Sequence, residues 1–176
     1  KDFPNKDKWK EAAQVEFDAL VSNNTWTLVD RSPALKVLKG KWVFSIKTDS
    51  ARCVTRFKAR WVVKGYLQQK GFDFMESYAP VCSFNNILLC LIIATKSGLI
   101  VKAGDVKTAF LNGALEDEVY VELPTGFNQT MRSSKVCKLN KSLYGLKQAP
   151  RCWYRTFRKF LLNNQFQGSD VDECIY

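Results

Sequence analysis

The chain has 176 residues, of which 46% are hydrophobic, 25% charged and 13% aromatic, and its formal net charge is +10. This length predicts one domain with a sizeable core, or one domain with an additional lobe. With 9 glycines and 5 prolines, collagen-like and low-complexity classes are excluded. The longest apolar run, residues 87–95, is too short for a membrane helix and the first residues are charged. We therefore expect neither a membrane span nor a signal peptide.

The chain contains six cysteines and no histidine. No two cysteines form a Cys-x-x-Cys pair, which disfavours a structural zinc site. Apolar neighbours, such as those of Cys90, indicate reduced and buried thiols in an intracellular protein. The missing histidine excludes Ser-His and Cys-His nucleophile pairs, so any catalysis has to use carboxylates, metals, lysine, tyrosine or cysteine.

Positive charge is concentrated in two segments. Residues 36–70 contain ten Lys or Arg against Asp49 alone, and residues 132–159 contain nine Lys or Arg and no acid. The segment between them, 102–122, carries two Lys and five Asp or Glu, a net charge of −3. Clustered charge of one sign repels itself unless a polyanion relieves it. This pattern favours a nucleic-acid partner over a solvated face, and no long basic amphipathic helix indicates a membrane surface.

The hydrophobic periodicity of the first half predicts a helix followed by strands. The helix is expected over 7–22 with Asp7 as its cap, and a short strand is expected over 25–29. Two segments of alternating character, 41–48 and 54–64, are joined by a short turn-like link. They therefore predict a β-hairpin.

The second strand of this hairpin predicts a ridge of positive charge. Arg56, Lys58 and Arg60 alternate with apolar residues, and side chains two apart on a strand lie about 6.6 Å from each other. Phosphates along a nucleic-acid strand or within a triphosphate have a comparable spacing. We expect the ridge to face phosphates, and a plain solvent-exposed strand is the alternative.

The second half of the chain continues the mixed pattern. An apolar helix buried in the core is expected over 85–96, followed by a strand over 99–106. Short strands are expected over 119–123 and 136–139, and a basic aromatic helix over 150–162. Because hairpins and helices are mixed without a regular βαβ repeat, the sequence predicts an α+β fold.

Asp105, at the end of the expected strand 99–106, is the candidate metal ligand. The plain alternative for a single aspartate in this position is a helix cap. A carboxylate at a strand end and the next backbone carbonyl, that of Val106, supply the hard oxygen ligands that Mg²⁺ prefers. An aromatic residue five positions on, Phe110, would pack against a bound sugar. In such a site two metal ions clamp the attacking and leaving oxygens of nucleotidyl transfer.

Six blocks follow one another in fixed order: KWVFSIK (41–47), RFKARWVVKG (56–65), YAPV (78–81), DVKTAFLNG (105–113), EVYVELPTGF (118–127) and LYGLKQAPRCWY (143–154). They resemble the fingers and the first two palm motifs of the reverse transcriptases of copia-type (Pseudoviridae-like) retrotransposons. The resemblance covers nearly the whole chain. It implies a partial reverse transcriptase domain over 1–176, with a helix and mostly fingers over about 1–98 and an incomplete palm over about 99–176.

The resemblance implies an RNA-directed DNA polymerase with the right-hand fingers-and-palm fold, mixed antiparallel sheets and packed helices. Asp105 is similar to the catalytic first metal-binding aspartate of the family, with the Val106 carbonyl beside it and two Mg²⁺ or Mn²⁺ ions in the complete enzyme. Phe110 resembles the gate that disfavours a 2′-hydroxyl. The residues implied in nucleotide binding are Lys47, Arg56, Lys58, Arg60, Phe110 and Gln148. Those implied in nucleic-acid binding are Lys64, Lys147, Arg151 and Arg155.

The partners that the resemblance implies are an RNA or DNA template with its primer, deoxynucleoside triphosphates, and the integrase and ribonuclease H of a Gag-Pol polyprotein, without a membrane. The implied location is an intracellular, cytoplasmic virus-like particle, or the nucleus. The family's second catalytic element, Tyr-x-Asp-Asp, is expected beyond Tyr176, so we expect residues 1–176 alone to be inactive. The alternative is a non-catalytic nucleic-acid-binding remnant of a decayed or captured element. Ser83 and Leu88, where the family usually carries basic residues, favour that alternative.

Overall fold

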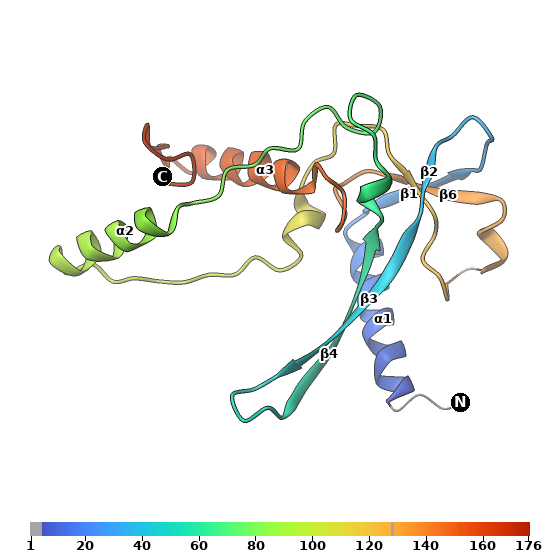
Figure 1. Ribbon diagram of the computed structural model, residues 1–176, viewed down its shortest axis with the longest axis horizontal. Coiled ribbons are helices and arrows are strands. Elements are labelled where there is room, and N and C mark those ends of the chain that lie inside the picture. Colours follow the sequence, from blue (N-terminus) through green and yellow to red (C-terminus); the bar gives the residue numbers. More distant parts are fainter. Residues whose placement is uncertain (1–4, 128) are drawn as a thin grey trace.

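The computed structural model describes residues 5–127 and 129–176, and it confirms the predicted α+β chain. Figure 1 shows its helices and strands. Within the described ranges the elements, with η for short 3₁₀ helices, are α1 (Lys6–Ser22), β1 (Trp26–Asp30), β2 (Val37–Leu38), β3 (Gly40–Thr48), β4 (Val54–Val63), η1 (Gly65–Leu67), α2 (Phe84–Lys96), η2 (Ala109–Asn112), β5 (Tyr120–Val121), η3 (Gln129–Met131), β6 (Lys135–Leu139) and α3 (Ala149–Asn163).

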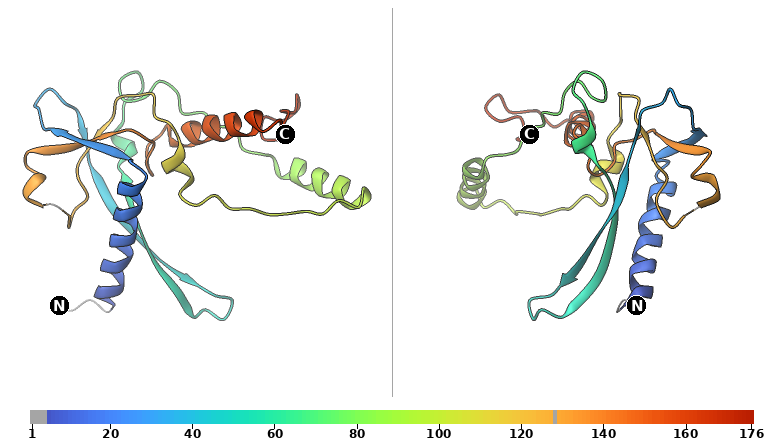
Figure 2. Two further views of the ribbon diagram at one scale, coloured as in Figure 1. Left: turned by 180° about the vertical axis from the view of Figure 1, so that it is seen from behind. Right: turned by 45° about the vertical axis from the view of Figure 1, so that its right-hand side comes forward.

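The strands form two sheets. The first has the order β1-β6-β5-β2; its β1–β6 and β5–β6 pairs are antiparallel and its β2–β5 pair is parallel. The second is the predicted hairpin of β3 and β4, which projects away from the first sheet with α1 alongside it (Figures 1 and 2). The rings of Trp9 on α1 and Phe57 on β4 meet edge to face, with 4.6 Å between centroids. Helix α1 therefore packs on the apolar face of the hairpin.

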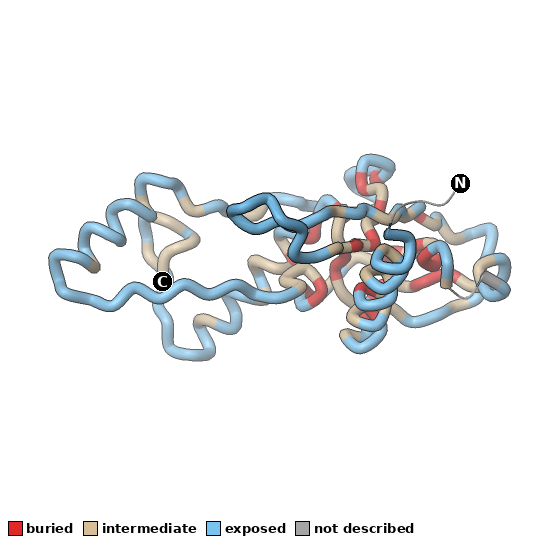
Figure 3. Tube along the Cα trace, turned by 90° about the horizontal axis from the view of Figure 1, so that it is seen from below, coloured by how far each residue is buried: buried red, intermediate tan, exposed pale blue. Residues whose placement is uncertain are grey.

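The core lies where the end of α1, the base of the hairpin, the four-stranded sheet and the start of α3 meet. Figure 3 shows the buried residues gathered in this part of the molecule, while the tip of the hairpin and α2 are exposed. The large buried side chains include Trp61, Leu20, Leu111 and Leu143. The chain thus holds the hairpin, η2 and the start of α3 against one another, and these elements carry most of the predicted site residues.

The start of the first helix differs from the prediction. The structure confirms a helix over Lys6–Ser22, but its N-cap is Asn5, which adopts a left-handed conformation (φ 64°) and makes no side-chain cap hydrogen bond. Asp7 instead lies in the first turn. Its carboxylate is exposed and pairs with Lys10 at 3.8 Å. Asp7 therefore acts there as a favourable charge near the positive end of the helix dipole.

Two expectations for the middle of the chain are wrong. The predicted helix forms as α2, capped by the Ser83 hydroxyl, which accepts a hydrogen bond from the Asn86 N–H at 3.2 Å, yet none of its residues is buried. Residues 99–106 form no strand, and Ile100 is 86% exposed. An apolar sequence favours burial, but a strand also needs a neighbouring strand whose backbone groups pair with its own N–H and C=O groups. The described part of the chain places none beside this segment.

The expectation of buried cysteines is correct for Cys137 and Cys152 and wrong for Cys90, which is exposed because α2 is uncovered. All six cysteines are free. Burial raises the pKa of Cys137 to about 12, and burial, with nearby carboxylates, raises that of Cys152 to about 11. These two thiols therefore stay protonated and unreactive at neutral pH.

The remaining elements agree with the prediction to different extents. The strand expected over 119–123 is reduced to Tyr120–Val121, whereas β6 and α3 form where they were expected, and Pro150 lies in the first turn of α3. Proline is favoured in a first turn because its missing N–H has no intrahelical partner there. Within residues 5–127 and 129–176, no helix combines the length and apolar character needed to cross a bilayer.

Candidate nucleic-acid and nucleotide interface

The predicted ridge of charge lies on one face of the β3–β4 hairpin. Lys47 pairs with Arg56 in the strand register, Ser45 with Lys58, and Val43 with Arg60. Because residues directly opposite each other in an antiparallel pair point to the same face, Lys47 joins the ridge. We call the face that carries Lys47, Arg56, Lys58 and Arg60 the cationic face.

The cationic face holds its charges without carboxylate partners. None of its four cations takes part in an ion pair among the described residues. Burial lowers the pKa of Lys58, and the neighbouring charges of Arg60 and Arg56 lower it further. Like charges opposite each other on a sheet are destabilising. A bound polyanion would relieve this repulsion, which is the electrostatic property expected of a phosphate-binding surface.

A buried carboxylate on α1 lies against β4 of this hairpin. Glu16 on α1 is 7% exposed, and its Oε1 accepts a hydrogen bond from the backbone N–H of Trp61 at 3.3 Å. Burial raises the pKa of Glu16, although the Trp61 N–H and the charges of Arg60 and Lys58 oppose the shift. The prediction from sequence missed this residue. Its signal was a glutamate on the same helical stripe as the apolar residues Phe17 and Leu20.

Tyr144 connects the cationic face to the predicted sugar gate. The Arg60 guanidinium lies over the Tyr144 ring, 5.4 Å from its centroid, and the Phe110 ring meets the same ring edge to face at 5.6 Å. Burial raises the pKa of Tyr144, as does the negative charge of Glu16, while Arg60 lowers it. Tyr144 was not among the predicted site residues. The structure thus brings Arg60 and Phe110, 50 residues apart in the printed sequence, onto one aromatic side chain.

The backbone before Phe110 turns sharply. Thr108 adopts a left-handed conformation (φ 52°) as the N-cap of η2. The Ser142 hydroxyl donates to the Phe110 carbonyl oxygen, and the Ser142 N–H donates to the Gly113 carbonyl oxygen at 2.9 Å. These bonds hold η2 against the turn that precedes α3. They fix the backbone of Phe110 and thereby the point from which its ring projects.

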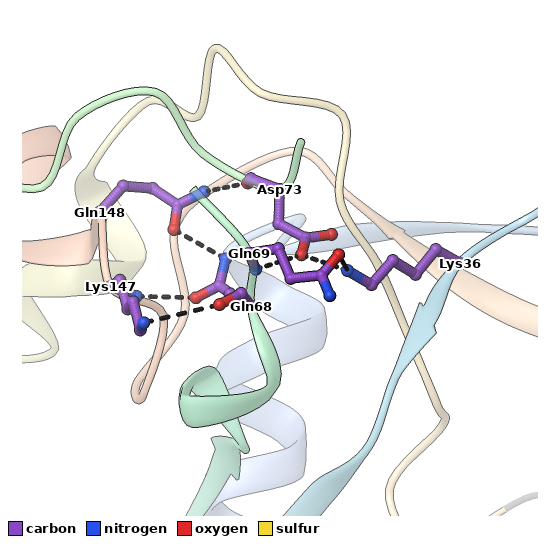
Figure 4. Close-up of polar contacts among 6 residues, drawn as sticks. All are labelled: Lys36, Gln68, Gln69, Asp73, Lys147 and Gln148. Atoms are coloured by element: carbon purple, nitrogen blue, oxygen red, sulfur yellow. Dashed lines mark hydrogen bonds and ion pairs between the residues drawn. The ribbon is translucent and has the colours of Figure 1, made fainter. Parts of the chain in front are cut away.

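Gln148 lies in a buried hydrogen-bond network rather than on an open surface. It is 2% exposed, and its Oε1 accepts from Gln68 Nε2 at 3.0 Å (Figure 4). Its Nε2 donates to the Asp73 carbonyl oxygen at 3.1 Å and to Asp117 Oδ2 at 3.0 Å. Every polar atom of this amide is therefore engaged inside the chain. Its role in nucleotide binding stays a prediction, and a direct contact would require this network to rearrange.

Lys147 is bound to the same network. Its backbone N–H donates to Gln68 Oε1 at 2.8 Å, and its Nζ donates to the Gln68 carbonyl oxygen at 3.5 Å and lies 5.3 Å from the Phe74 ring centroid. Lys36 is joined to the same loop, because its Nζ pairs with Asp73 Oδ2 at 2.5 Å (Figure 4). The loop after β4 is thereby attached to the start of α3, so that the hairpin and the block of residues 143–154 form one unit.

The predicted nucleic-acid contacts on α3 are held by carboxylates. Arg151 pairs with Glu76 at 2.5 Å, and Arg155 pairs with Glu116 at 2.6 Å. Ion pairs near the surface contribute little to stability. Lys64, at the end of β4, donates its backbone N–H to the Lys39 carbonyl oxygen at 2.9 Å. The contacts of these three side chains with nucleic acid remain predictions.

Asp105 and Val106, the predicted metal ligands, lie outside the helices and strands. Asp105 is exposed in the extended segment that joins α2 to η2 (Figures 1 and 2), and Val106 beside it is also exposed. Their carboxylate and carbonyl oxygens are of the hard type that Mg²⁺ takes. In the part of the chain that the structure describes, however, no three His, Cys, Asp or Glu side chains gather to hold a metal ion. The donor type fits a magnesium site, and the number of donors does not.

Comparison with known proteins defines the class of this chain. The family model described as reverse transcriptase (RNA-dependent DNA polymerase) matches residues 23–176. The chain therefore belongs to the reverse transcriptase family. It is 45% identical over 173 residues to the retrovirus-related Pol polyprotein from transposon TNT 1-94 of Nicotiana tabacum. It is 40% identical over 171 residues to those from transposons RE2 and RE1 of Arabidopsis thaliana.

These alignments cover 98% and 97% of this chain but 13% and 12% of the relatives. The chain thus spans about an eighth of the length of each Pol polyprotein. No solved structure matches it significantly. The resemblance to copia-type reverse transcriptases that the sequence blocks indicated is confirmed by the family match and by the transposon relatives.

Proposed function

We propose that this chain is the fingers and the first part of the palm of an RNA-directed DNA polymerase encoded by a copia-type retrotransposon. Residues 1–98 would be mostly fingers, and residues 99–176 an incomplete palm with the right-hand arrangement. The observation that carries the proposal is the cationic face, where Lys47 lies opposite Arg56 without a carboxylate partner. Family membership supplies the reaction class. The cationic face supplies a positively charged surface that can bind nucleic-acid phosphates.

In this proposal the cationic face holds phosphates of the template and of the incoming deoxynucleoside triphosphate. Phosphate contacts by lysine and arginine provide affinity and position the nucleic acid without reading its sequence. Arg60 contacts the Tyr144 ring, which in turn supports Phe110. Phe110 would then present a fixed ring to the sugar of the nucleotide. A 2′-hydroxyl on that sugar would meet this ring, which gives the polymerase its preference for deoxyribose.

Asp105 and the Val106 carbonyl would hold one Mg²⁺ or Mn²⁺ when further carboxylates complete the site. A bound metal ion supplies Lewis-acid stabilisation of the charge that develops on the transferred phosphoryl group. Among residues 5–127 and 129–176, Asp105 lies in an exposed segment and no three metal-ligating side chains gather, which supports a two-metal site that needs carboxylates from further along the polyprotein. The partners of the complete protein would be the template with its primer, and the integrase and ribonuclease H of the same polyprotein, within a virus-like particle.

Primer extension tests this proposal. Purified residues 1–176 should bind a primer–template and fail to extend it with Mg²⁺ present. A longer chain that carries the same residues followed by a Tyr-x-Asp-Asp segment should extend the primer, and Asp105→Asn in that chain should abolish synthesis while leaving binding intact. Mg²⁺-dependent extension by residues 1–176, lost in Asp105→Asn, would contradict the proposal that the metal site needs carboxylates from outside residues 1–176. Binding without extension by the longer chain would favour a non-catalytic remnant.

A further inference from the structure

We propose that a second surface of the fingers hairpin binds unpaired nucleobases of a single strand. This inference rests on the proposed function, because it adds a base-binding surface to a phosphate-binding one. The surface is a groove of about 780 Å³ between α1, β3 and the loop that precedes η3. We call it the aromatic groove. It is lined mainly by Trp9, Trp42, Phe44 and Phe127, with Lys6 and Lys10 among the residues around them.

The walls of the aromatic groove are preformed by contacts among its rings. Trp9 meets Phe44 edge to face at 5.3 Å between centroids, and Trp42 lies nearly parallel to Phe44 at 6.2 Å. The Trp42 Nε1 donates to the Thr125 carbonyl oxygen at 2.9 Å, and Trp42 lies 6.0 Å from Phe127. The indole is therefore held by both a hydrogen bond and ring contacts, so little conformational entropy is lost when a ligand enters.

The chemistry of the groove selects a flat, π-bearing ligand with negative charge nearby. Aromatic side chains stack on nucleobases, and every base offers a π-face, so such binding tolerates different sequences. Lys6 and Lys10 are both exposed beside the rings. Their ammonium groups can reach phosphates while their aliphatic stems cover apolar surface. Lys10 already lies 3.8 Å from the Asp7 carboxylate, but an apolar peptide would leave the charge of Lys6 uncompensated, which is why we assign a single-stranded nucleic acid as the occupant.

The groove and the cationic face lie on opposite sides of the same two strands. In the register Phe44 pairs with Ala59 and Trp42 with Trp61, whereas the neighbouring residue Ser45 pairs with Lys58. Successive side chains on a strand alternate between faces, so the rings and the cations are separated by one thickness of sheet. The sheet is the two-stranded pair β3–β4, so β3 is one of its edges. A single strand that passes over this edge can contact both surfaces.

Fluorescence anisotropy with two oligonucleotides tests this inference on residues 1–176. The first probe is an oligothymidylate of about twelve nucleotides, and the second has the same phosphates but abasic sites in place of the bases. Phe44→Ala should weaken binding of oligothymidylate about tenfold, since one stacked base contributes about that factor. It should leave the affinity for the abasic probe and the salt dependence unchanged. Phe44→Tyr, which keeps the ring, should bind like the unmodified chain.

Ile46→Ala is the matched control. Ile46 follows Phe44 on the same face of β3 and has the same exposed fraction, 49%, but does not line the groove. It should bind both probes like the unmodified chain. Equal affinities of the unmodified chain for the two probes would overturn the base-stacking role, and so would an equal loss of affinity for both probes in Phe44→Ala. Either result would leave the proposed role of the cationic face standing. Failure of both probes to bind would overturn the proposed function as well.

Discussion

The backbone N–H of Val63 donates a hydrogen bond to the carbonyl oxygen of Tyr144 at 2.8 Å. This bond joins the end of β4 to the turn that precedes α3, and it fixes Tyr144 between Arg60 and Phe110. The approach is close because Gly145 lacks a side chain: a Cβ on Gly145 would lie 2.1 Å from the Val63 carbonyl oxygen. The geometry of the candidate interface thus depends on a main-chain contact between two segments that are distant in sequence.

Gly145→Ala should therefore destabilise the fold strongly. Gly145 has φ +91°, a conformation that strains any residue with a side chain, and its added methyl group would collide with backbone rather than with a flexible side chain. We expect a loss of about 3 kcal/mol or more in the free energy of unfolding, measured by urea denaturation. Gly168→Ala is the control, because its Cβ would meet no atom closer than 3.7 Å. A Gly145→Ala chain as stable as the control would show that the Val63–Tyr144 contact is not as described.

Gln148→Ala should also destabilise the chain, because the buried amide serves several partners. Its removal takes away the acceptor of Gln68 Nε2 and the donor to the Asp73 carbonyl and to the Asp117 carboxylate, and it opens a cavity. The expected loss in unfolding free energy is about 2 to 4 kcal/mol. Thermal or urea denaturation measures it, with the exposed Gln167→Ala as the matched control. A loss no larger than that of the control would indicate that Gln148 is free to serve a ligand instead.

Glu16→Gln should raise stability at neutral pH. The folded-state pKa of Glu16 lies above its ordinary value of 4.5, mainly through burial. The folded chain therefore binds this proton more tightly than the unfolded chain does, and stability falls as the pH rises from 4.5 through the folded-state pKa. Glutamine keeps an oxygen for the Trp61 N–H and has no charge to desolvate. The stability gained by the variant should be small near pH 4.5 and grow toward pH 7.

Urea denaturation of both chains across this pH range measures the effect. Glu11→Gln, which removes an exposed carboxylate from the same helix, controls for the change in net charge. A Glu16→Gln chain that is less stable than the unmodified chain at pH 7 would mean that attraction to Arg60 and Lys58 outweighs desolvation. That outcome would contradict the direction of the pKa shift and would make Glu16 a charge partner of the cationic face.

The parts of this fold that follow from local pattern could be predicted from the sequence. Strict alternation specified the hairpin and the common face of Arg56, Lys58 and Arg60, because strand geometry alone determines which side chains share a face. The helix over Ala149–Asn163 was likewise predicted from its proline and its basic and aromatic residues. Asp105 and Phe110 were given their roles by position and by resemblance, and these roles stay predictions.

The parts that depend on distant partners could not be predicted in this way. Tyr144 and Glu16 acquire their positions from residues that lie 84 and 45 positions away in the sequence, Arg60 and Trp61, and no local period indicates such contacts. The burial of α2 was predicted wrongly because hydrophobicity reports a preference for burial, not the presence of a covering element. The strand over 99–106 failed for the same reason, since a strand requires a partner.

The salt dependence of nucleic-acid binding tests the central claim most directly. The logarithm of the binding constant for a DNA duplex should fall steeply with the logarithm of salt concentration, by about one unit of slope for each phosphate contact. Replacing Arg56, Lys58 and Arg60 together by alanine should flatten this slope by about three units. The control replaces three exposed lysines elsewhere, Lys70, Lys96 and Lys102, and thereby removes the same net charge. A flattened slope in the first variant alone would support the cationic face as the phosphate-binding surface, and an unchanged slope would contradict it.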